Sequence, residues 1–260
     1  MSVLAGKRVV ITRPAHQADW LVERLLAAGA VPIAFPTIEI IPCQDTARLD
    51  QALTDLATYD WLVFTSQNGV DFFWRRFVQA NLNLLSLAGL KVAAIGPATA
   101  RALAEREVKV HYVPAEYVAE AVARGFPDPD GKRILLPRAT VARDALVRGL
   151  TQRGAVVDEI PVYETVTPRL EPQVWQELDF RVDVVTFTSS STVRGFFDLL
   201  GERSKAVLQE AASACIGPIT AGTLQEFGFQ PQIIATEYTA DGLLNDLIAY
   251  FETSDRKETE

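Results

Sequence analysis

The sequence predicts an α/β fold with two parallel sheets of five strands each, covered by helices on both faces. Short apolar strands alternate with amphipathic helices along the chain, which is typical of right-handed crossovers between parallel strands. The predicted strands are apolar almost throughout, as expected for strands that are buried on both faces. In addition, blocks from the first half of the chain recur in the same order in the second half, which indicates two similar units.

The recurring blocks extend over most of the chain. They are Lys7–Arg13 with Lys132–Arg138, Phe64–Ser66 with Phe187–Ser189, Ile95–Ala100 with Ile216–Ala221, and Glu116–Tyr117 with Glu237–Tyr238. The spacing between partners is nearly constant and drifts only as far as loop insertions allow. Solenoid repeats are only about 20–50 residues long. The repeat is therefore a duplicated half of the protein.

The elements can be placed in order from periodicity and turn residues. The predicted strands are Arg8–Thr12, Val31–Phe35, Trp61–Thr65, Val92–Ile95, Val110–Val113, Arg133–Leu136, Val156–Ile160, Val184–Thr188, Ala212–Ile216 and Ile233–Ala235. Helices expected between them include Ala18–Ala28, Gly69–Gln79, Ala98–Arg106, Arg143–Arg153, Val193–Leu200, Thr220–Phe227 and Ala240–Phe251. Gly29 and Gly154 occupy equivalent repeat positions, where a left-handed residue would end a helix.

Two proline-bracketed segments interrupt the alternation at equivalent repeat positions. They are Pro36–Pro42 and Pro161–Pro168, and both are rich in β-branched residues. We interpret them as paired interdomain linkers over residues 36–42 and 161–168. From the residues alone, each half could fold by itself, or the halves could exchange pieces at these linkers.

Composition excludes several classes of function. Of the 260 residues 48% are hydrophobic, yet no apolar run reaches the roughly 18 residues of a membrane span. Residues 1–7 lack the features of a secretory signal. The two cysteines, Cys43 and Cys215, predict a reduced cytoplasmic protein, and two histidines are too few for a His/Cys metal cluster. A net charge of −8 argues against nucleic-acid binding.

Small polar residues follow four predicted strands at the starts of helices. In an open parallel sheet, ligands bind outside the carboxyl ends of the strands. Helix starts also present free N–H groups and a positive dipole end, which favour anions. Ser and Thr are equally ordinary helix caps, so capping is the alternative reading. The candidate residues are Thr65, Ser66, Thr99, Ser189, Ser190 and Thr220.

Three further residues are candidates by position. Arg13 and Arg138 end the first strand of each repeat, where a guanidinium could bind a carboxylate or phosphate or form a surface salt bridge. Tyr163 breaks the duplication, because its repeat partner is Ile38. A phenol on the linker could place a hydrogen-bond donor in a cleft between two lobes, or it could simply pack on a β-ladder. No glycine-rich phosphate loop or nucleophile elbow accompanies these residues.

Taken together, these blocks resemble the uroporphyrinogen-III synthase family over about the whole chain. The resemblance is carried by Val63–Val70, Ile95–Ala100, Pro161–Thr165, Phe187–Ser190, Ile216–Ala221 and Glu237–Ala240. It implies two flavodoxin-like three-layer α/β/α domains with parallel five-stranded sheets, an intertwined duplication, joined by a two-stranded linker. Domain 1 would comprise residues 1–37 and 166–260, and domain 2 residues 42–160.

The resemblance also implies the activity. The family cyclises linear hydroxymethylbilane to uroporphyrinogen III in tetrapyrrole and heme biosynthesis, with inversion of ring D, a spiro intermediate and loss of water. Tyr163 would then be the catalytic residue and assist the departing hydroxyl, while the six Ser and Thr side chains would bind acetate and propionate groups. Arg13 and Arg138 are added as substrate-binding residues from their position alone.

The expected enzyme is a cytoplasmic, monomeric hydro-lyase with two domains and no metal or cofactor. Its partner is a small-molecule substrate, with no nucleic acid or membrane and at most transient contact with neighbouring pathway enzymes. One alternative is a non-catalytic two-lobed cytosolic binder of a small anionic ligand. The other is a nucleotide- or flavin-binding α/β protein, against which the missing phosphate fingerprint counts.

Overall fold

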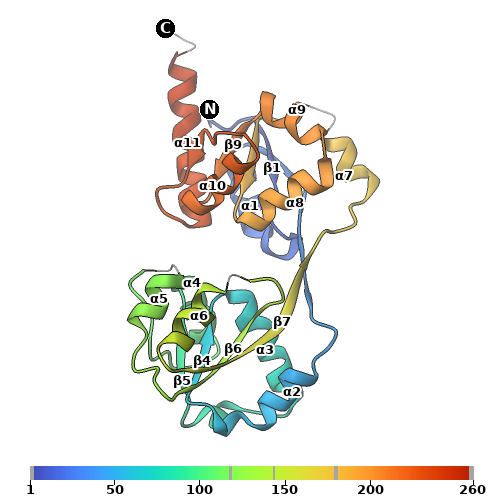
Figure 1. Cartoon of the computed structure of the whole chain (residues 1–260). Coiled ribbons are helices and arrows are strands. Elements are labelled where there is room, and N and C mark those ends of the chain that lie inside the picture. The colour runs from blue at the N-terminus through green and yellow to red at the C-terminus, as the bar shows by residue number, and fades with distance from the viewer. Residues whose placement is uncertain (1–2, 117–118, 143, 179–180, 258–260) are drawn as a thin grey trace. The chain divides into compact units, whose positions relative to one another are not determined.

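The computed structural model describes residues 3–116, 119–142, 144–178 and 181–257. The chain divides into two compact units (Figure 1). Unit 1 comprises Met1–Glu39 and Val166–Glu260, and unit 2 comprises Ile40–Thr165. The chain therefore passes from one unit to the other twice, once within each proline-bracketed segment.

Unit 1 contains a five-stranded sheet with the order β10-β9-β8-β1-β2. Its strands are β1 (Arg8–Ile11), β2 (Val31–Ala34), β8 (Val184–Phe187), β9 (Ala212–Cys215) and β10 (Ile233–Ile234). All neighbouring strands run parallel. In the order along unit 1, this is the 2-1-3-4-5 arrangement of flavodoxin-like sheets.

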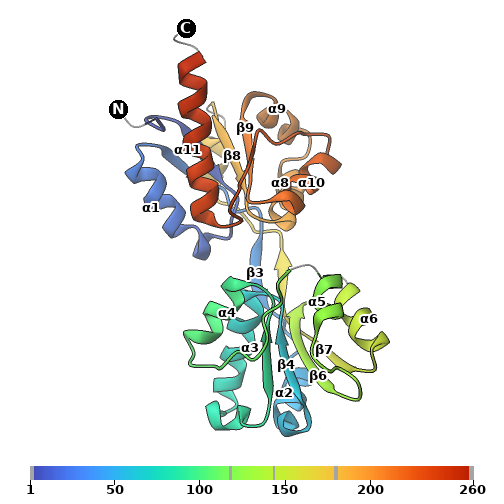
Figure 2. The same cartoon turned by 90° about the vertical axis from the view of Figure 1, so that its left-hand side faces the viewer.

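Helices cover both faces of this sheet (Figure 2). The side chains of β1 alternate: Val9 and Ile11 pack under α1 (Asp19–Ala27) and α11 (Ala240–Lys257), whereas Val10 packs on the opposite side. The helices on that opposite side are α7 (Pro172–Glu177), α8 (Ser190–Leu200), α9 (Arg203–Glu210) and α10 (Pro218–Glu226). A short 3-10 turn, η1 (Ala15–Gln17), precedes α1.

Unit 2 has the same three layers around a sheet of order β3-β7-β6-β4-β5. Its strands are β3 (Glu39–Pro42), β4 (Trp61–Phe64), β5 (Lys91–Ala94), β6 (Arg133–Ala139) and β7 (Val156–Val166). One face is covered by α2 (Ala47–Thr54), α3 (Gln67–Gln79) and α4 (Pro97–Ala104), the other by α5 (Ala119–Gly125) and α6 (Ala145–Gln152). The 3-10 turns η2 (Leu56–Thr58) and η3 (Leu84–Leu87) connect elements of this unit.

The two sequence repeats exchange their first strands. Sheet 1 joins β1 and β2 of the first repeat to β8, β9 and β10 of the second. Sheet 2 joins β6 and β7, which are the repeat equivalents of β1 and β2, to β4 and β5 of the first repeat. The prediction of an intertwined α/β duplication with five-stranded sheets is confirmed.

One predicted strand is wrong. Residues 110–113 make only an isolated parallel bridge between Tyr112 and Ala93, and β3 is the fifth strand of sheet 2. His111 explains the interruption. Its ring Nδ1 accepts the Val92 N–H at 3.0 Å. The Val92 N–H is therefore not available for a regular β-ladder between β5 and residues 110–113.

The predicted linker segments also contribute to sheet 2. The second one, over 161–168, includes the last part of β7, in which Tyr163 lies in register with Ala139 of β6. The first one includes β3, which neighbours β7. Cys43 and Cys215 are both buried free thiols. None of the helices in the described part of the chain combines the length and apolar character needed to cross a bilayer.

Candidate functional site

Tyr163 and Ser66 meet at the carboxyl edge of sheet 2. Ser66 follows β4 directly after Thr65, and Tyr163 lies near the end of β7. The Tyr163 hydroxyl lies 3.1 Å from Ser66 Oγ, a hydrogen bond in which either oxygen can be the donor. The structure thus brings together the predicted catalytic residue and one predicted substrate-binding residue, which are far apart in the sequence.

Ser66 is held by its role as the N-cap of α3. Its backbone is extended, with φ −154° and ψ 155°, and its Oγ accepts the Gly69 N–H at 3.0 Å. Gly69 lets the helix start close to sheet 2, because a Cβ there would lie 3.2 Å from the Pro137 carbonyl oxygen and 3.3 Å from Ser66 Oγ. This capping chemistry leaves the Ser66 oxygen within hydrogen-bond distance of the phenol.

Tyr163 is almost enclosed, with 8% of its surface exposed. Its carbonyl oxygen accepts the Thr140 N–H at 2.9 Å and the Thr140 hydroxyl at 3.2 Å. Its ring stacks on Phe72 of α3, with 5.7 Å between centroids and 23° between planes. Packing of Tyr163 on the β-ladder and a role as hydrogen-bond donor are therefore compatible, because its ring packs while its hydroxyl contacts Ser66.

Cys43 lies beside the same group. Its Sγ is 3.4 Å from Thr140 Oγ1. Burial raises the pKa of the Cys43 thiol, and the hydrogen bond to Thr140 opposes this rise only in part. The thiol therefore stays protonated at neutral pH and is a poor nucleophile.

The other predicted residues of this edge lie close to the helix starts. Thr65 is half-buried next to Ser66. Thr99 lies in the first turn of α4, is 3% exposed, and donates its hydroxyl to the Ile95 carbonyl at 3.3 Å. In this arrangement the Thr99 proton is used within its own helix start, although Thr99 does not cap α4, whose N-cap is Gly96.

Unit 1 carries the equivalent residues on its own sheet edge. Ser189 caps α8, accepting the Thr192 N–H at 3.1 Å, in a reciprocal capping box. Ser190 Oγ lies 2.7 Å from Thr223 Oγ1. Thr220 is buried in the first turn of α10. These hydroxyls belong to a different unit from Tyr163.

The two arginines differ in their surroundings. Arg13 follows β1 and is partly buried, and its Nε has no hydrogen-bond partner among the described residues. Burial lowers the pKa of the Arg13 guanidinium, although arginine stays charged at any physiological pH. Arg138 is only 6% exposed and its Nη1 lies 3.1 Å from Glu159 Oε1. The salt bridge considered as an alternative for Arg138 therefore exists, but its guanidinium is buried rather than on the surface.

The position equivalent to Tyr163 in unit 1 is filled differently. Ile38 is 8% exposed, and its Cγ2 lies 3.0 Å from where a Cβ of Gly195 would be. The adjacent Thr37 donates its hydroxyl to the Thr192 carbonyl at 2.9 Å. In unit 1 this position therefore holds the packed side chain of Ile38, whereas in unit 2 it holds the phenol of Tyr163.

Sequence reasoning missed Phe72 and Thr140, the two residues that hold Tyr163. Both pairings join distant parts of the chain, and neither residue type marks a site by itself. The one available signal was the two adjacent phenylalanines of α3, of which Phe73 is fully buried and Phe72 only partly. A second aromatic ring next to a core position indicates a further contact at the margin of the core, here with Tyr163.

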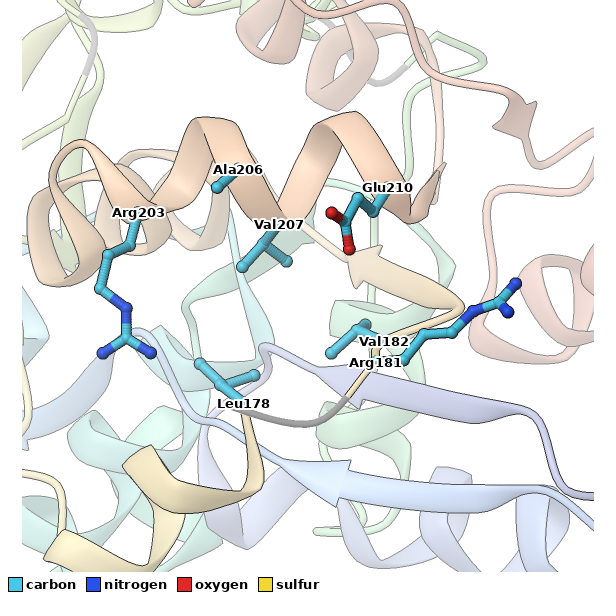
Figure 3. A pocket seen from close by; sticks show the side chains of 7 residues that line it. All are labelled: Leu178, Arg181, Val182, Arg203, Ala206, Val207 and Glu210. Carbon is cyan, nitrogen blue, oxygen red and sulfur yellow. The ribbon is translucent and has the colours of Figure 1, made fainter.

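A hollow of about 350 Å³ in unit 1 lies away from these residues (Figure 3). Its lining consists of Leu178, Arg181, Val182, Arg203, Ala206, Val207 and Glu210. Its charged side chains come from two segments, since Arg203 and Glu210 belong to α9 and Arg181 precedes β8. None of the predicted site residues lines it.

Comparison with known proteins places the chain in a family. The family model described as "Uroporphyrinogen-III synthase HemD" matches residues 19–245. A "Uroporphyrinogen-III synthase" of Synechococcus elongatus is 37% identical over 249 residues, which cover 93% of this chain and 94% of the relative. A "Putative uroporphyrinogen-III synthase" of Methanothermobacter thermautotrophicus is 32% identical over 257 residues, covering 95% and 98%.

Solved structures agree on the fold. A mutant uroporphyrinogen III synthase from Thermus thermophilus superposes with a TM-score of 0.69 at 19% identity, covering 95% of this chain and 100% of that one. The uroporphyrinogen-III synthetase of Helicobacter pylori gives a TM-score of 0.65 at 20% identity, covering 94% and 99%. The family model and the sequence relatives extend over nearly the whole chain, and on their evidence this protein belongs to the uroporphyrinogen-III synthase family.

Proposed function

We propose that this protein is a uroporphyrinogen-III synthase, a lyase that converts hydroxymethylbilane to uroporphyrinogen III with inversion of ring D and loss of water. The observation that carries the proposal is the 37% identity to the Synechococcus elongatus synthase over 93% of the chain. The Tyr163–Ser66 pair at a sheet edge adds a donor of the kind that the reaction needs.

The reaction begins when the bilane loses its terminal hydroxyl. The phenol O–H of Tyr163 can donate a hydrogen bond or proton to that departing hydroxyl. Ser66 Oγ accepts the Gly69 N–H and keeps a hydrogen bond to the phenol, which orients the Tyr163 hydroxyl. The departing oxygen leaves as water, and the carbon it leaves behind becomes the electrophile.

Ring D of the bilane then attacks this carbon to give the spiro intermediate, which rearranges to the type III product. The proton that the pyrrole system releases on closure replaces the one that Tyr163 has donated. The unassisted bilane closes to the symmetric type I isomer instead. The enzyme must therefore favour one transition state over another mainly by holding the chain of pyrroles in position. Because the reaction depends mainly on positioning, a site made of hydroxyl groups and helix starts can be sufficient for catalysis.

The acetate and propionate groups of the substrate need anion-binding groups. We assign this role to Thr65, Ser66, Ser189, Ser190 and the helix starts next to them, where N–H groups and the helix dipole favour carboxylates. The same role is proposed for Thr99 and Thr220, which are buried and would act through the backbone of their helix turns, and for the two arginines. Arg13 adds a guanidinium whose Nε has no partner among the described residues, and Arg138 adds a buried positive charge.

The decisive experiment is incubation with hydroxymethylbilane, followed by oxidation and separation of the porphyrin isomers. Type III product above the spontaneous background supports the proposal. Type I product alone, at the spontaneous rate, contradicts it and favours a non-catalytic binder of an anionic ligand.

Tyr163→Phe tests the assigned donor. We expect turnover to type III to fall by roughly 10- to 100-fold, at or below the lower end of the roughly 100- to 10,000-fold contribution that is usual for a positioned proton donor, with folding retained. Tyr112→Phe is the matched control, since it removes the same atom from a different ring of unit 2. Unchanged turnover in the Tyr163 variant would remove that residue from the mechanism without removing the activity.

A further inference from the structure

The ring of Tyr163 is held by a second aromatic side chain that has no assigned role. Phe72 stacks on it with a centroid distance of 5.7 Å and an interplanar angle of 23°. On the same helix, the Arg75 guanidinium lies 5.0 Å from the centroid of Phe72. Arg75, Phe72 and Tyr163 thus form a contiguous series of contacts that runs from α3 to the sheet edge.

This stack supplies a constraint that the Ser66 hydrogen bond lacks. Two side-chain torsion angles determine the position of a tyrosine hydroxyl. A single hydrogen bond to that hydroxyl does not fix the orientation of the ring. Face-to-face contact with Phe72 restricts that swing. The main chain of Tyr163 is already held by the Thr140 N–H and by its register with Ala139.

Both side-chain constraints come from one rigid element. Ser66 is the N-cap of α3 and Phe72 lies within the same helix, so the hydrogen bond and the stack move together. Core packing of α3 is supplied by other residues. Phe73 and Phe77 are fully buried, whereas Phe72 is only partly buried and lies beside the core cluster.

We propose that Phe72, supported by Arg75, is a positioning residue that orients the Tyr163 phenol for the reaction. The inference rests on the proposed function, because it gives Phe72 a role only through Tyr163. Small errors in the placement of a reacting group are costly to the rate, so loss of the stack should appear in kcat more than in KM.

The test is a double-mutant cycle measured as turnover to type III product. Phe72→Leu keeps an apolar side chain and removes the stack, and we expect kcat to fall about 3- to 10-fold. In the Tyr163→Phe background, Phe72→Leu should cause no further fall, because the hydroxyl that it orients is gone. Phe72→Tyr keeps a stacking ring and should restore most of the activity.

A matched control separates positioning from packing. Phe197→Leu removes a stacked ring from unit 1, where the ring centroids of Phe197 and Phe227 are 4.1 Å apart, and it should lower stability with little effect on kcat. Arg75→Gln offers a second variant that leaves the core untouched. It should lower kcat about twofold, again only when Tyr163 is present.

The outcomes distinguish the two proposals. If Phe72→Leu lowers kcat equally in both backgrounds, or if Phe197→Leu is as damaging, the positioning role is wrong while the synthase activity stands. If Phe72→Leu does not fold, additive effects of Arg75→Gln and Tyr163→Phe overturn the inference in the same way. If the unmodified protein yields only type I product, the proposed function itself has failed.

Discussion

Ser66 combines two tasks that can be measured separately. Its Oγ caps α3 through the Gly69 N–H and also contacts the Tyr163 hydroxyl. Ser189 caps α8 in unit 1 without a phenol beside it, because the equivalent of Tyr163 there is the buried Ile38. The duplication therefore contains its own comparison between a helix cap and a helix cap that also orients a phenol.

Ser66→Ala should cost stability and turnover together. Loss of an N-cap destabilises by about 0.5–2 kcal/mol, so Ser66→Ala and Ser189→Ala should lower the free energy of unfolding by similar amounts. We expect kcat to fall several-fold only in the Ser66 variant, because only there does the phenol lose its partner, whereas Ser189→Ala should act on KM. Equal kcat values for the two variants would show that Ser66 is only a cap.

At the scale of elements, close packing of α8 in unit 1 depends on a missing side chain. A Cβ on Gly195 would clash with the Thr37 carbonyl oxygen, which is main chain and cannot rotate away. Gly222 in α10 provides the opposite case, since a Cβ there would have nothing within 4 Å. The same substitution should therefore have opposite effects in two neighbouring helices.

Gly195→Ala should lower the free energy of unfolding by about 1–3 kcal/mol through overpacking. Gly222→Ala should raise it by up to about 1 kcal/mol, the difference in helix propensity between the two residues. Denaturant titration of both variants against the unmodified protein measures the pair. A Gly195 variant as stable as the parent would show that α8 can shift away from Thr37 without cost.

His111 makes the pairing beside β5 sensitive to pH. Its Nδ1 can accept the Val92 N–H only when the ring is neutral. Burial lowers the pKa of His111, with smaller contributions from Lys109 and Lys91. Since the folded pKa lies below the unfolded value of about 6.5, the contribution to stability is complete above that value and is lost as pH falls through the folded pKa.

Unfolding measured from about pH 7.5 to about pH 5 should therefore show less stability at the acid end. His111→Gln should flatten that pH dependence, whereas His16→Gln, at an exposed position, should leave it unchanged. If the His111 variant keeps the full pH dependence, other groups are responsible for the loss of stability in acid.

The strands were predictable because their signal is local, whereas several contacts were not. Apolar runs and turn residues located β1, β4 and β8 within a residue of their observed ends. The Val110–Val113 prediction failed because a ring nitrogen of His111 takes a main-chain donor, which no propensity encodes. Likewise, Phe72 and Thr140 hold Tyr163 through pairings between distant segments, and a single sequence contains no information about such register.

For the whole molecule, the exchange of strands between repeats has a consequence for folding. Unit 2 is one continuous stretch, Ile40–Thr165, whereas unit 1 needs both ends of the chain. Within sheet 1, β1 lies between β8 and β2, so the segment after Val166 lacks an inner strand of its own sheet. The two halves of the sequence are similar repeats, but the two structural units are therefore not equivalent in folding.

Fragments of the chain should show this asymmetry. A fragment of residues 40–165 should fold alone and unfold cooperatively, because it contains all of sheet 2 except one terminal residue each of β3 and β7. A fragment of residues 166–260 should remain largely unfolded, since it would leave the backbone N–H and C=O groups along one edge of β8 unpaired and the α1 side of the core exposed. Adding a peptide of residues 1–39 should restore its structure, measured by circular dichroism and thermal unfolding. A fragment 166–260 that unfolds cooperatively without the peptide would show that unit 1 can fold without β1 and β2. The exchange of strands would then affect the connectivity of the chain more than the stability of unit 1.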